Sequence, residues 1–127
     1  MTKIRSIVKN PGESPQRVEL SHEGEGALQA LQSAVKGMIT TFYVPFLDRA
    51  GVTVWANDEG LLIGLSPNLW VGQQPIVGPV CFTSTNEDGD TTSLTDEQAE
   101  VVRRWLEGVT LTEADRESLT LQISRLG

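Results

Sequence analysis

The order of the elements that the sequence predicts limits the possible folds more than any other feature. Residues 3–9 and 16–20 are strand-like, and the turn rich in glycine and proline between them makes the pair a candidate hairpin. In residues 27–35, apolar side chains recur three and four positions apart, which indicates a helix. Further strand-like runs follow, at residues 38–44, 52–56 and 76–84. Because strands and helices do not alternate strictly, an α+β domain is favoured over a doubly wound parallel sheet.

The clearest single element is a helix that begins at Thr95. In a capping box, the hydroxyl of Thr95 accepts a hydrogen bond from the amide of Gln98, and the Gln98 side chain reaches back. Gly108 is expected to end this helix. The last segment, 112–126, has apolar spacings that fit either a helix or a strand. The start signal at Thr112 favours the helix.

Together these elements predict a single α+β domain over residues 1–127. We expect a mostly antiparallel or mixed sheet of about five strands, with two to three helices on one face. A chain of 127 residues is long enough to bury about two-thirds of its unfolded surface. Residues 107–127 are expected to form a C-terminal extension. In the run 76–84, Gly78 and Pro79 mark a bulge or an edge, whereas the short apolar run 61–65 cannot be assigned from periodicity.

The scarcity of cysteine and histidine limits the chemistry of the chain. The single cysteine, Cys81, and the single histidine, His22, exclude an intrachain disulfide, a cysteine-cluster zinc site and a two-histidine metal site. Cys81 lies in an apolar run, so a buried, inert thiol is favoured over a catalytic pair with His22. No glycine-rich phosphate loop or nucleophile motif is present. The sequence therefore predicts no catalytic residue, no metal and no cofactor.

The charge of the chain is unevenly distributed. The net charge is −7, and residues 56–127 carry twelve acidic and four basic side chains. Such a balance argues against direct binding to a nucleic-acid backbone. The acidic excess can serve solubility, or it can form a surface for a basic partner. No apolar run approaches the ~20 residues of a membrane span, no signal-peptide pattern is present, and an unpaired cysteine fits a reducing compartment, so we expect a cytoplasmic protein.

A first group of candidate binding residues surrounds a tryptophan. Trp70 follows the break at Pro67 and Asn68 and precedes Gln73 and Gln74, so we expect it in a loop. A tryptophan in a loop with polar neighbours is a candidate ligand contact, although such a side chain can also cover the edge of the core.

A second group of candidates is acidic. Glu87, Asp88 and Asp90 surround Gly89 in a polar loop. If Gly89 were the sixth residue of a calcium loop, Ser84 and Thr95 would stand where carboxylates are needed. We therefore expect a solvated turn that could contact a basic partner.

Several segments occur in an order that resembles a known family. They are Asn57–Asn68, Ile76–Val80, Asp88–Asp90 and Ser93–Ala99. This order resembles the small phage, prophage and plasmid proteins grouped as domain of unknown function 3846, over about residues 3–106. Gly64, Asn68 and Gly78 match the family pattern. The resemblance implies an accessory protein of a mobile element and implies no particular reaction.

Two classes of function follow from these features. The first is a non-enzymatic accessory protein that binds a host or phage protein, such as a component of host defence. A homo-oligomer is compatible with this class. The second is a protein that binds or sequesters a small, nucleotide-like ligand through Asn68, Trp70, Gln73 and Gln74. An enzyme is the least favoured class.

Overall fold

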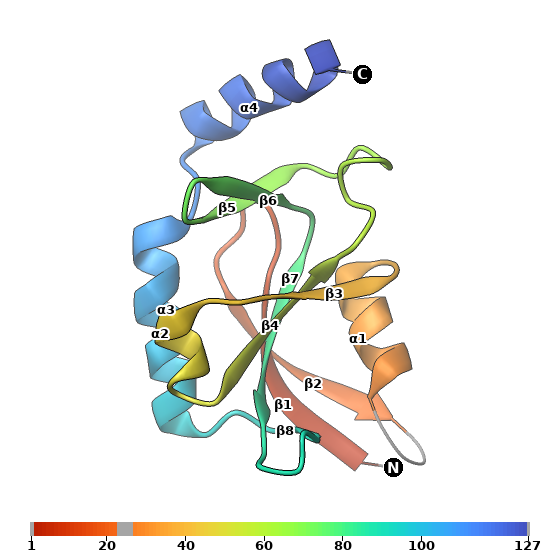
Figure 1. The fold of residues 1–127 in the computed structure, drawn as a ribbon, viewed down its shortest axis with the longest axis vertical. Coiled ribbons are helices and arrows are strands. Elements are labelled where there is room, and N and C mark those ends of the chain that lie inside the picture. The colour runs from red at the N-terminus through yellow and green to blue at the C-terminus, as the bar shows by residue number, and fades with distance from the viewer. Residues whose placement is uncertain (1, 23–26, 127) are drawn as a thin grey trace.

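The structure is a computed structural model that describes residues 2–22 and 27–126 (Figure 1). Its helices are α1 (Leu28–Val35), α2 (Pro45–Asp48), α3 (Asp96–Val109) and α4 (Glu113–Leu126). Its strands are β1 (Thr2–Lys9), β2 (Gln16–His22), β3 (Ile39–Phe42), β4 (Val52–Asn57), β5 (Pro67–Val71), β6 (Gln74–Val77), β7 (Val80–Thr85) and β8 (Thr91–Thr92).

The main sheet has the strand order β2-β1-β7-β4-β3, and every neighbouring pair in it is antiparallel. The short strand β8 pairs with β7. Strands β5 and β6 form a separate antiparallel hairpin. The predicted α+β class, with a single small domain and an antiparallel sheet, is confirmed.

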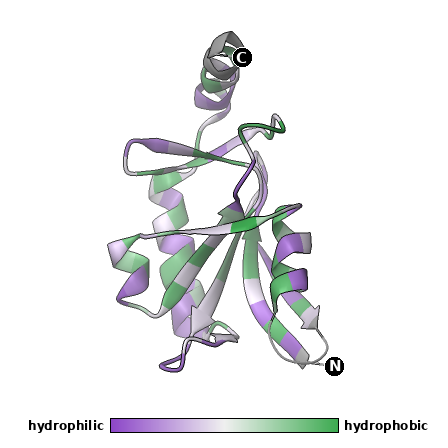
Figure 2. Ribbon diagram, turned by 45° about the vertical axis from the view of Figure 1, so that its right-hand side comes forward, coloured by the Kyte–Doolittle hydropathy of each residue, from purple (hydrophilic) through white to green (hydrophobic). Residues whose placement is uncertain are grey.

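Both faces of the main sheet are apolar and covered by helices. Ile7 and Phe82 belong to a core cluster with α3, whereas their neighbours Val8 and Cys81 belong to a second cluster with α1. Adjacent residues of a strand point to opposite sides, so α1 and α3 lie on different faces. The expectation that all helices share one face is therefore wrong. Figure 2 shows hydrophobic residues along the central strands and along both helices.

The predicted strand at 76–84 is two strands in different sheets. Gly78 has a φ of +81°, a conformation that favours glycine, and it turns the chain between β6 and β7. Trp70 lies in strand β5, opposite Pro75 of β6, and not in a loop. Gly72, with a φ of +61°, and Gln73 make the tight turn of this hairpin. This hairpin was not predicted from the sequence, because Pro67 and Pro75 on either side of Trp70 are also typical of loops.

The predicted capping box and the predicted C-terminal helix are confirmed. The expectation that Gly108 ends α3 is wrong, because the helix runs through Gly108 to Val109 and is capped at Thr110. The amide of Gln98 donates to the Thr95 hydroxyl over 3.1 Å, and the Thr95 amide donates to the Gln98 side chain over 2.9 Å. Residues 113–126 form a helix, as the start signal at Thr112 indicated. Among the described residues, no helix is long and apolar enough to span a membrane.

Candidate functional site

The turn that follows β4 is anchored at its start by a buried asparagine. The side-chain amide of Asn57 donates to the backbone carbonyls of Val35 and Lys36, both over 3.1 Å, and so caps the end of α1. The side-chain oxygen of Asn57 accepts a hydrogen bond from the Glu59 amide over 2.8 Å. One side chain therefore joins a helix end, a strand end and the beginning of the turn.

The other end of the turn packs closely on β6 and the residue that follows it. A Cβ on Gly60 would lie 2.6 Å from Cγ2 of Val77, and a Cβ on Gly78 would lie 2.6 Å from Cδ1 of Leu65. The Leu65 amide donates to the Gly60 carbonyl over 2.9 Å. A side chain at either glycine would displace one of these methyl groups, and the φ of +81° at Gly78 also favours glycine. The turn is therefore held by close packing on β6 as well as by the hydrogen bonds of Asn57.

Three consecutive apolar side chains project from this fixed turn. Leu61, Leu62 and Ile63 are 59%, 86% and 55% exposed, and we call them the apolar turn. A cluster of exposed apolar side chains is typical of interaction surfaces. Because the flanking backbone is held by buried contacts, this exposure is a property of the fold.

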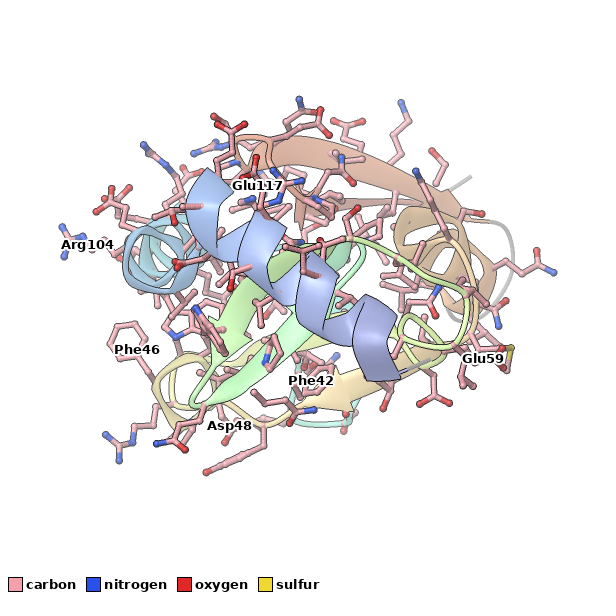
Figure 3. All side chains as sticks on the ribbon, turned by 90° about the horizontal axis from the view of Figure 1, so that it is seen from above. Phe42, Phe46, Asp48, Glu59, Arg104 and Glu117 are labelled. Atoms are coloured by element: carbon pink, nitrogen blue, oxygen red, sulfur yellow. The ribbon has the colours of Figure 1, made fainter. Side chains whose placement is uncertain are left out.

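A groove of about 460 Å³ lies beside the apolar turn. Its walls are Thr40 and Phe42 of β3 on one side and residues 74–77 of β6 on the other. The charged side chains that line it, Asp58 and Glu59, are both acidic and exposed. Seen from above, Glu59 lies on the side of the molecule away from Arg104 (Figure 3). Among the described strands, β3 and β6 are the ends of their sheets, so both walls carry an unpaired strand edge.

The residues predicted around Trp70 do not form one site. Asn68 is fully buried, and its side-chain amide donates to the carbonyls of Lys9 and Gly78 over 2.7 and 2.9 Å. Trp70 is half-buried on β5, while Gln73 and Gln74 are exposed at the tip of the hairpin. Of the four residues, Gln74 alone lines the groove. Asn68 has no surface with which to touch a ligand, and it holds strands together instead.

The predicted acidic residues lie at the opposite end of the molecule from the hairpin β5–β6, beside β8 (Figure 1). Glu87, Asp88 and Asp90 are all exposed. The side-chain oxygen of Asn86 accepts hydrogen bonds from the amides of Asp88 and Asp90, over 3.0 and 2.9 Å. The loop is thus a solvated turn closed by its own asparagine.

One buried charged residue was missed by sequence reasoning. Lys9 is 1% exposed, and its ammonium donates to the Asn10 carbonyl over 2.9 Å and to the Asn68 side-chain oxygen over 3.1 Å. Burial, followed by the charge of Arg116, lowers the pKa of Lys9, while Glu13 acts in the opposite direction. Its position two residues after Ile7 could have revealed it, since alternate residues of a strand share a face.

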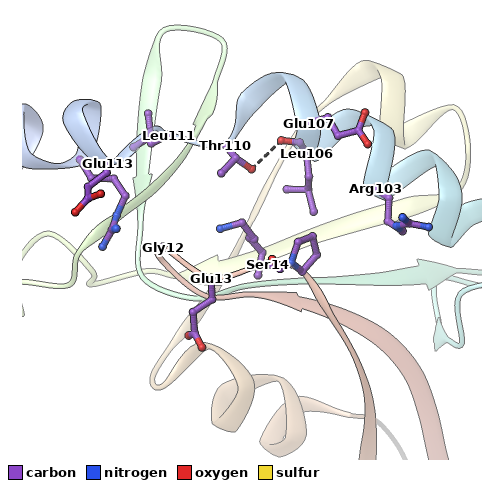
Figure 4. Close-up of a pocket in the computed structure, with 12 residues that line it drawn as sticks. Gly12, Glu13, Ser14, Arg103, Leu106, Glu107, Thr110, Leu111 and Glu113 are labelled. Carbon is purple, nitrogen blue, oxygen red and sulfur yellow. Dashed lines mark hydrogen bonds between the residues drawn. The ribbon is translucent and has the colours of Figure 1, made fainter.

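Lys9 lines a pocket of about 740 Å³ near the C-terminal end of α3 and the start of α4 (Figure 4). The pocket contains Arg103 and Arg116 together with Glu13, Glu107 and Glu113. Positively and negatively charged side chains therefore line the same concave surface, and one of the cations, Lys9, is buried.

The only cysteine cannot act as a nucleophile in this environment. Cys81 is fully buried, as predicted, and burial raises the pKa of its thiol to about 12. The side chain of His22 lies outside the described part of the structure. Within that described part, no group of three histidine, cysteine, aspartate or glutamate side chains could hold a metal ion.

Fold and site together define a small α+β protein with an antiparallel sheet covered on both faces and an apolar turn beside an acidic groove. The family model described as a domain of unknown function (DUF3846) matches residues 4–108, so the chain belongs to that family. The matched range runs from β1 nearly to the end of α3 and leaves α4 outside. Comparison with curated proteins and with solved structures gives no match.

Proposed function

We propose that this protein is a non-enzymatic accessory protein that binds a partner protein through the apolar turn and the groove beside it. The observation that carries the proposal is the exposure of Leu61, Leu62 and Ile63 on a backbone fixed by Asn57 and Gly60. Fully burying side chains of this kind contributes roughly 1.5–3 kcal/mol each before the costs of association. A preformed apolar surface of this kind binds a partner without first ordering a loop.

The charge around the groove indicates the chemistry of the partner. Asp58 and Glu59 line it, and the whole chain carries a net charge of −7. A partner segment with apolar side chains flanked by lysine or arginine would bury the apolar turn and meet these two carboxylates. The resemblance to proteins of phages and mobile elements suggests a host or phage protein in the host cytoplasm as the partner, such as a component of host defence.

The proposal is tested by placing a photo-crosslinking amino acid at Leu62 and by comparing two variants of the full chain. The first variant replaces Leu61, Leu62 and Ile63 with serine. The second replaces Leu28 and Phe46, which are exposed apolar residues outside the groove, with serine. We expect a basic host or phage protein to crosslink at position 62. Its affinity should fall at least about tenfold for the first variant and stay unchanged for the second.

Two results would overturn the proposal. One is equal affinity of the captured partner for the wild-type chain and the serine variant of the apolar turn. The other is the same loss for both variants, which would show a general dependence on surface hydrophobicity. Unfolding midpoints of both variants, measured alongside, establish that the chains are folded.

A second candidate function is the binding of a small ligand, as the sequence also suggested. The observation that favours it is the pocket that contains Lys9, since ligand sites combine a concave surface with a few polar groups. The cluster of Asn68, Trp70, Gln73 and Gln74 does not support it, because Asn68 is fully buried. We expect ligand binding in this pocket to be independent of the apolar turn.

A further inference from the structure

We propose that the pocket containing Lys9 binds one oxyanion group, a phosphate or a carboxylate of a small molecule, between the Lys9 ammonium and the Arg116 guanidinium. The ligand would bridge the end of β1 and the first turn of α4. This pocket and the groove between β3 and β6 share no lining residue. Binding of an oxyanion in the pocket therefore does not depend on the proposed partner surface.

The first argument is an unpaired buried cation. Lys9 is 1% exposed, and among the described residues no carboxylate forms an ion pair with it within 4.0 Å. Its ammonium has three N–H donors, and the described residues supply two acceptors, the Asn10 carbonyl and the Asn68 side chain. A buried charge without a counter-ion is costly, and a bound anion would reduce that cost.

The second argument is a second cation held close to the first. Arg116 and Lys9 line the same pocket, and the charge of Arg116 contributes to lowering the pKa of Lys9. Its Nε donates to the Pro67 carbonyl over 3.2 Å, which is the one hydrogen bond that its side chain makes to the described residues. The remaining N–H groups form the planar fork that matches a phosphate or carboxylate. An anion between the two cations would replace their mutual repulsion with two attractions.

A glycine leaves room for this guanidinium beside the turn. Gly12, in the turn between β1 and β2, has a φ of +74°, and a Cβ there would lie 2.5 Å from Nη1 of Arg116. The guanidinium therefore rests against the bare backbone of the turn. The contact sets the arginine beside the pocket before any ligand arrives, which lowers the ordering cost of binding.

The carboxylates in the pocket restrict what kind of anion fits. Glu13, Glu107 and Glu113 also line it, with Arg103 beside Glu107 (Figure 4). These carboxylates would repel a polyphosphate, but they can accept hydrogen bonds from hydroxyl or ammonium groups of the same ligand. The volume of about 740 Å³ falls within the range of small-molecule sites. The site therefore fits a small molecule with one oxyanion group and several donors.

The proposed site depends on a part of the chain outside the matched family range. Arg116 belongs to α4, and the family match ends at residue 108. Lys9, by contrast, lies within the match. We infer that the C-terminal helix completes an anion site on a family fold.

The test is a calorimetric and NMR titration of the full chain with inorganic phosphate and, separately, with acetate. Sodium chloride at the same ionic strength serves as the reference. We expect saturable binding of at least one oxyanion, shifts of the Gly12 and Arg116 amide signals, and a rise in the pKa of Lys9. The two titrations distinguish a phosphate site from a carboxylate site.

A matched pair of variants assigns the binding to the pocket. Arg116→Gln should weaken oxyanion binding about tenfold or more, because it removes a charge-assisted contact. Arg104→Gln removes the same charge from an exposed residue of α3 that pairs with Glu100 and does not line the pocket. This control should bind as the wild type does.

Either of two results would overturn the inference. One is the absence of saturable binding by both phosphate and acetate. The other is an equal loss for Arg116→Gln and Arg104→Gln, which would indicate general charge screening. Lys9 and Asn68 would then be a structural pair. Neither result bears on partner capture by the apolar turn.

Discussion

Two asparagines, Asn57 and Asn86, make the same local turn in very different surroundings. Each side-chain oxygen accepts a hydrogen bond from the amide two residues further on, Glu59 in one turn and Asp88 in the other. Asn57 is buried and also caps the end of α1, whereas Asn86 is exposed and bonds only within its own loop among the described residues. The turn after Asn57 presents two carboxylates followed by the apolar side chains of residues 61–63, whereas the turn after Asn86 presents carboxylates without exposed apolar side chains.

This difference shows how to weigh an exposed loop as a binding surface. Solvated carboxylates on a self-contained turn need no partner, since they favour solubility by themselves. Exposure of leucine and isoleucine side chains to water is unfavourable, and here a backbone fixed by buried contacts keeps them exposed. We therefore place the proposed interface at the apolar turn and give the acidic loop of Glu87, Asp88 and Asp90 at most a steering role.

The largest expected effect is that of Asn57→Ala. The substitution removes three hydrogen bonds and leaves the carbonyls of Val35 and Lys36 without their side-chain donor. Losing buried partners of this kind should cost about 3 kcal/mol. Denaturant unfolding measures the change, and a loss below about 1 kcal/mol would show that water replaces the Asn57 amide.

Thr95→Ala should have an intermediate effect. The exposed hydroxyl of Thr95 caps α3, and the Gln98 side chain of the same capping box also donates to the Ala50 carbonyl over 2.8 Å. Loss of the cap should lower the free energy of unfolding by about 1 kcal/mol. Thr95→Ser, which keeps the hydroxyl, is the control. An equal loss in both variants would mean that the threonine methyl group, and not the cap, is responsible.

Asn86→Ala should have a smaller effect than either. Its turn is exposed, so water can bond the freed amides of Asp88 and Asp90. We expect a loss of about 0.5 kcal/mol, within the usual range for surface sites. Measured beside Asn57→Ala, the variant isolates the contribution of burial. Equal losses would contradict the distinction drawn between the two turns.

The smallest effect on stability is expected when Glu87, Asp88 and Asp90 are replaced together by their amides. All three are exposed, so the free energy of unfolding should change by less than about 0.5 kcal/mol. Once a partner is identified, its association rate at low salt should fall less for this variant than for a variant with Asp58→Asn and Glu59→Gln. Exposed charges act mainly on encounter, and those beside the interface act most strongly. The opposite order would move the interface to the acidic loop.

Much of the fold could be predicted from local signals. The hairpin of β1 and β2, the helix α1 and the capping box at Thr95 follow from turn residues, periodicity and capping chemistry, and all three are present. The division at Gly78 could not be predicted, because a glycine in an apolar run fits a bulge as well as a turn between two sheets. The strand at Trp70 was missed for a related reason, since its flanking prolines are also typical of loops.

Less of the candidate sites than of the fold could be predicted from the sequence. Asn68, Trp70, Gln73 and Gln74 are close along the chain, but the pleat of β5 and the hairpin turn separate them in space. The apolar turn lay in the run 61–65, which periodicity could not assign. Its exposure depends on Asn57 and Gly60 meeting α1 and β6, which are distant in sequence.

By itself, the sequence determined most of the helices and strands of the main sheet, the α+β class, the family and the acidic balance, because these depend on residue type and local spacing. The tertiary structure decided which apolar residues stay in water and which charge is buried. Leu62 and Leu69 are both leucines, yet one is 86% exposed and the other fully buried. Lys9 and Lys3 lie on the same face of one strand, yet Lys9 is buried and Lys3 is exposed. Exposure is set by long-range packing, and a residue's neighbours along the chain do not specify it.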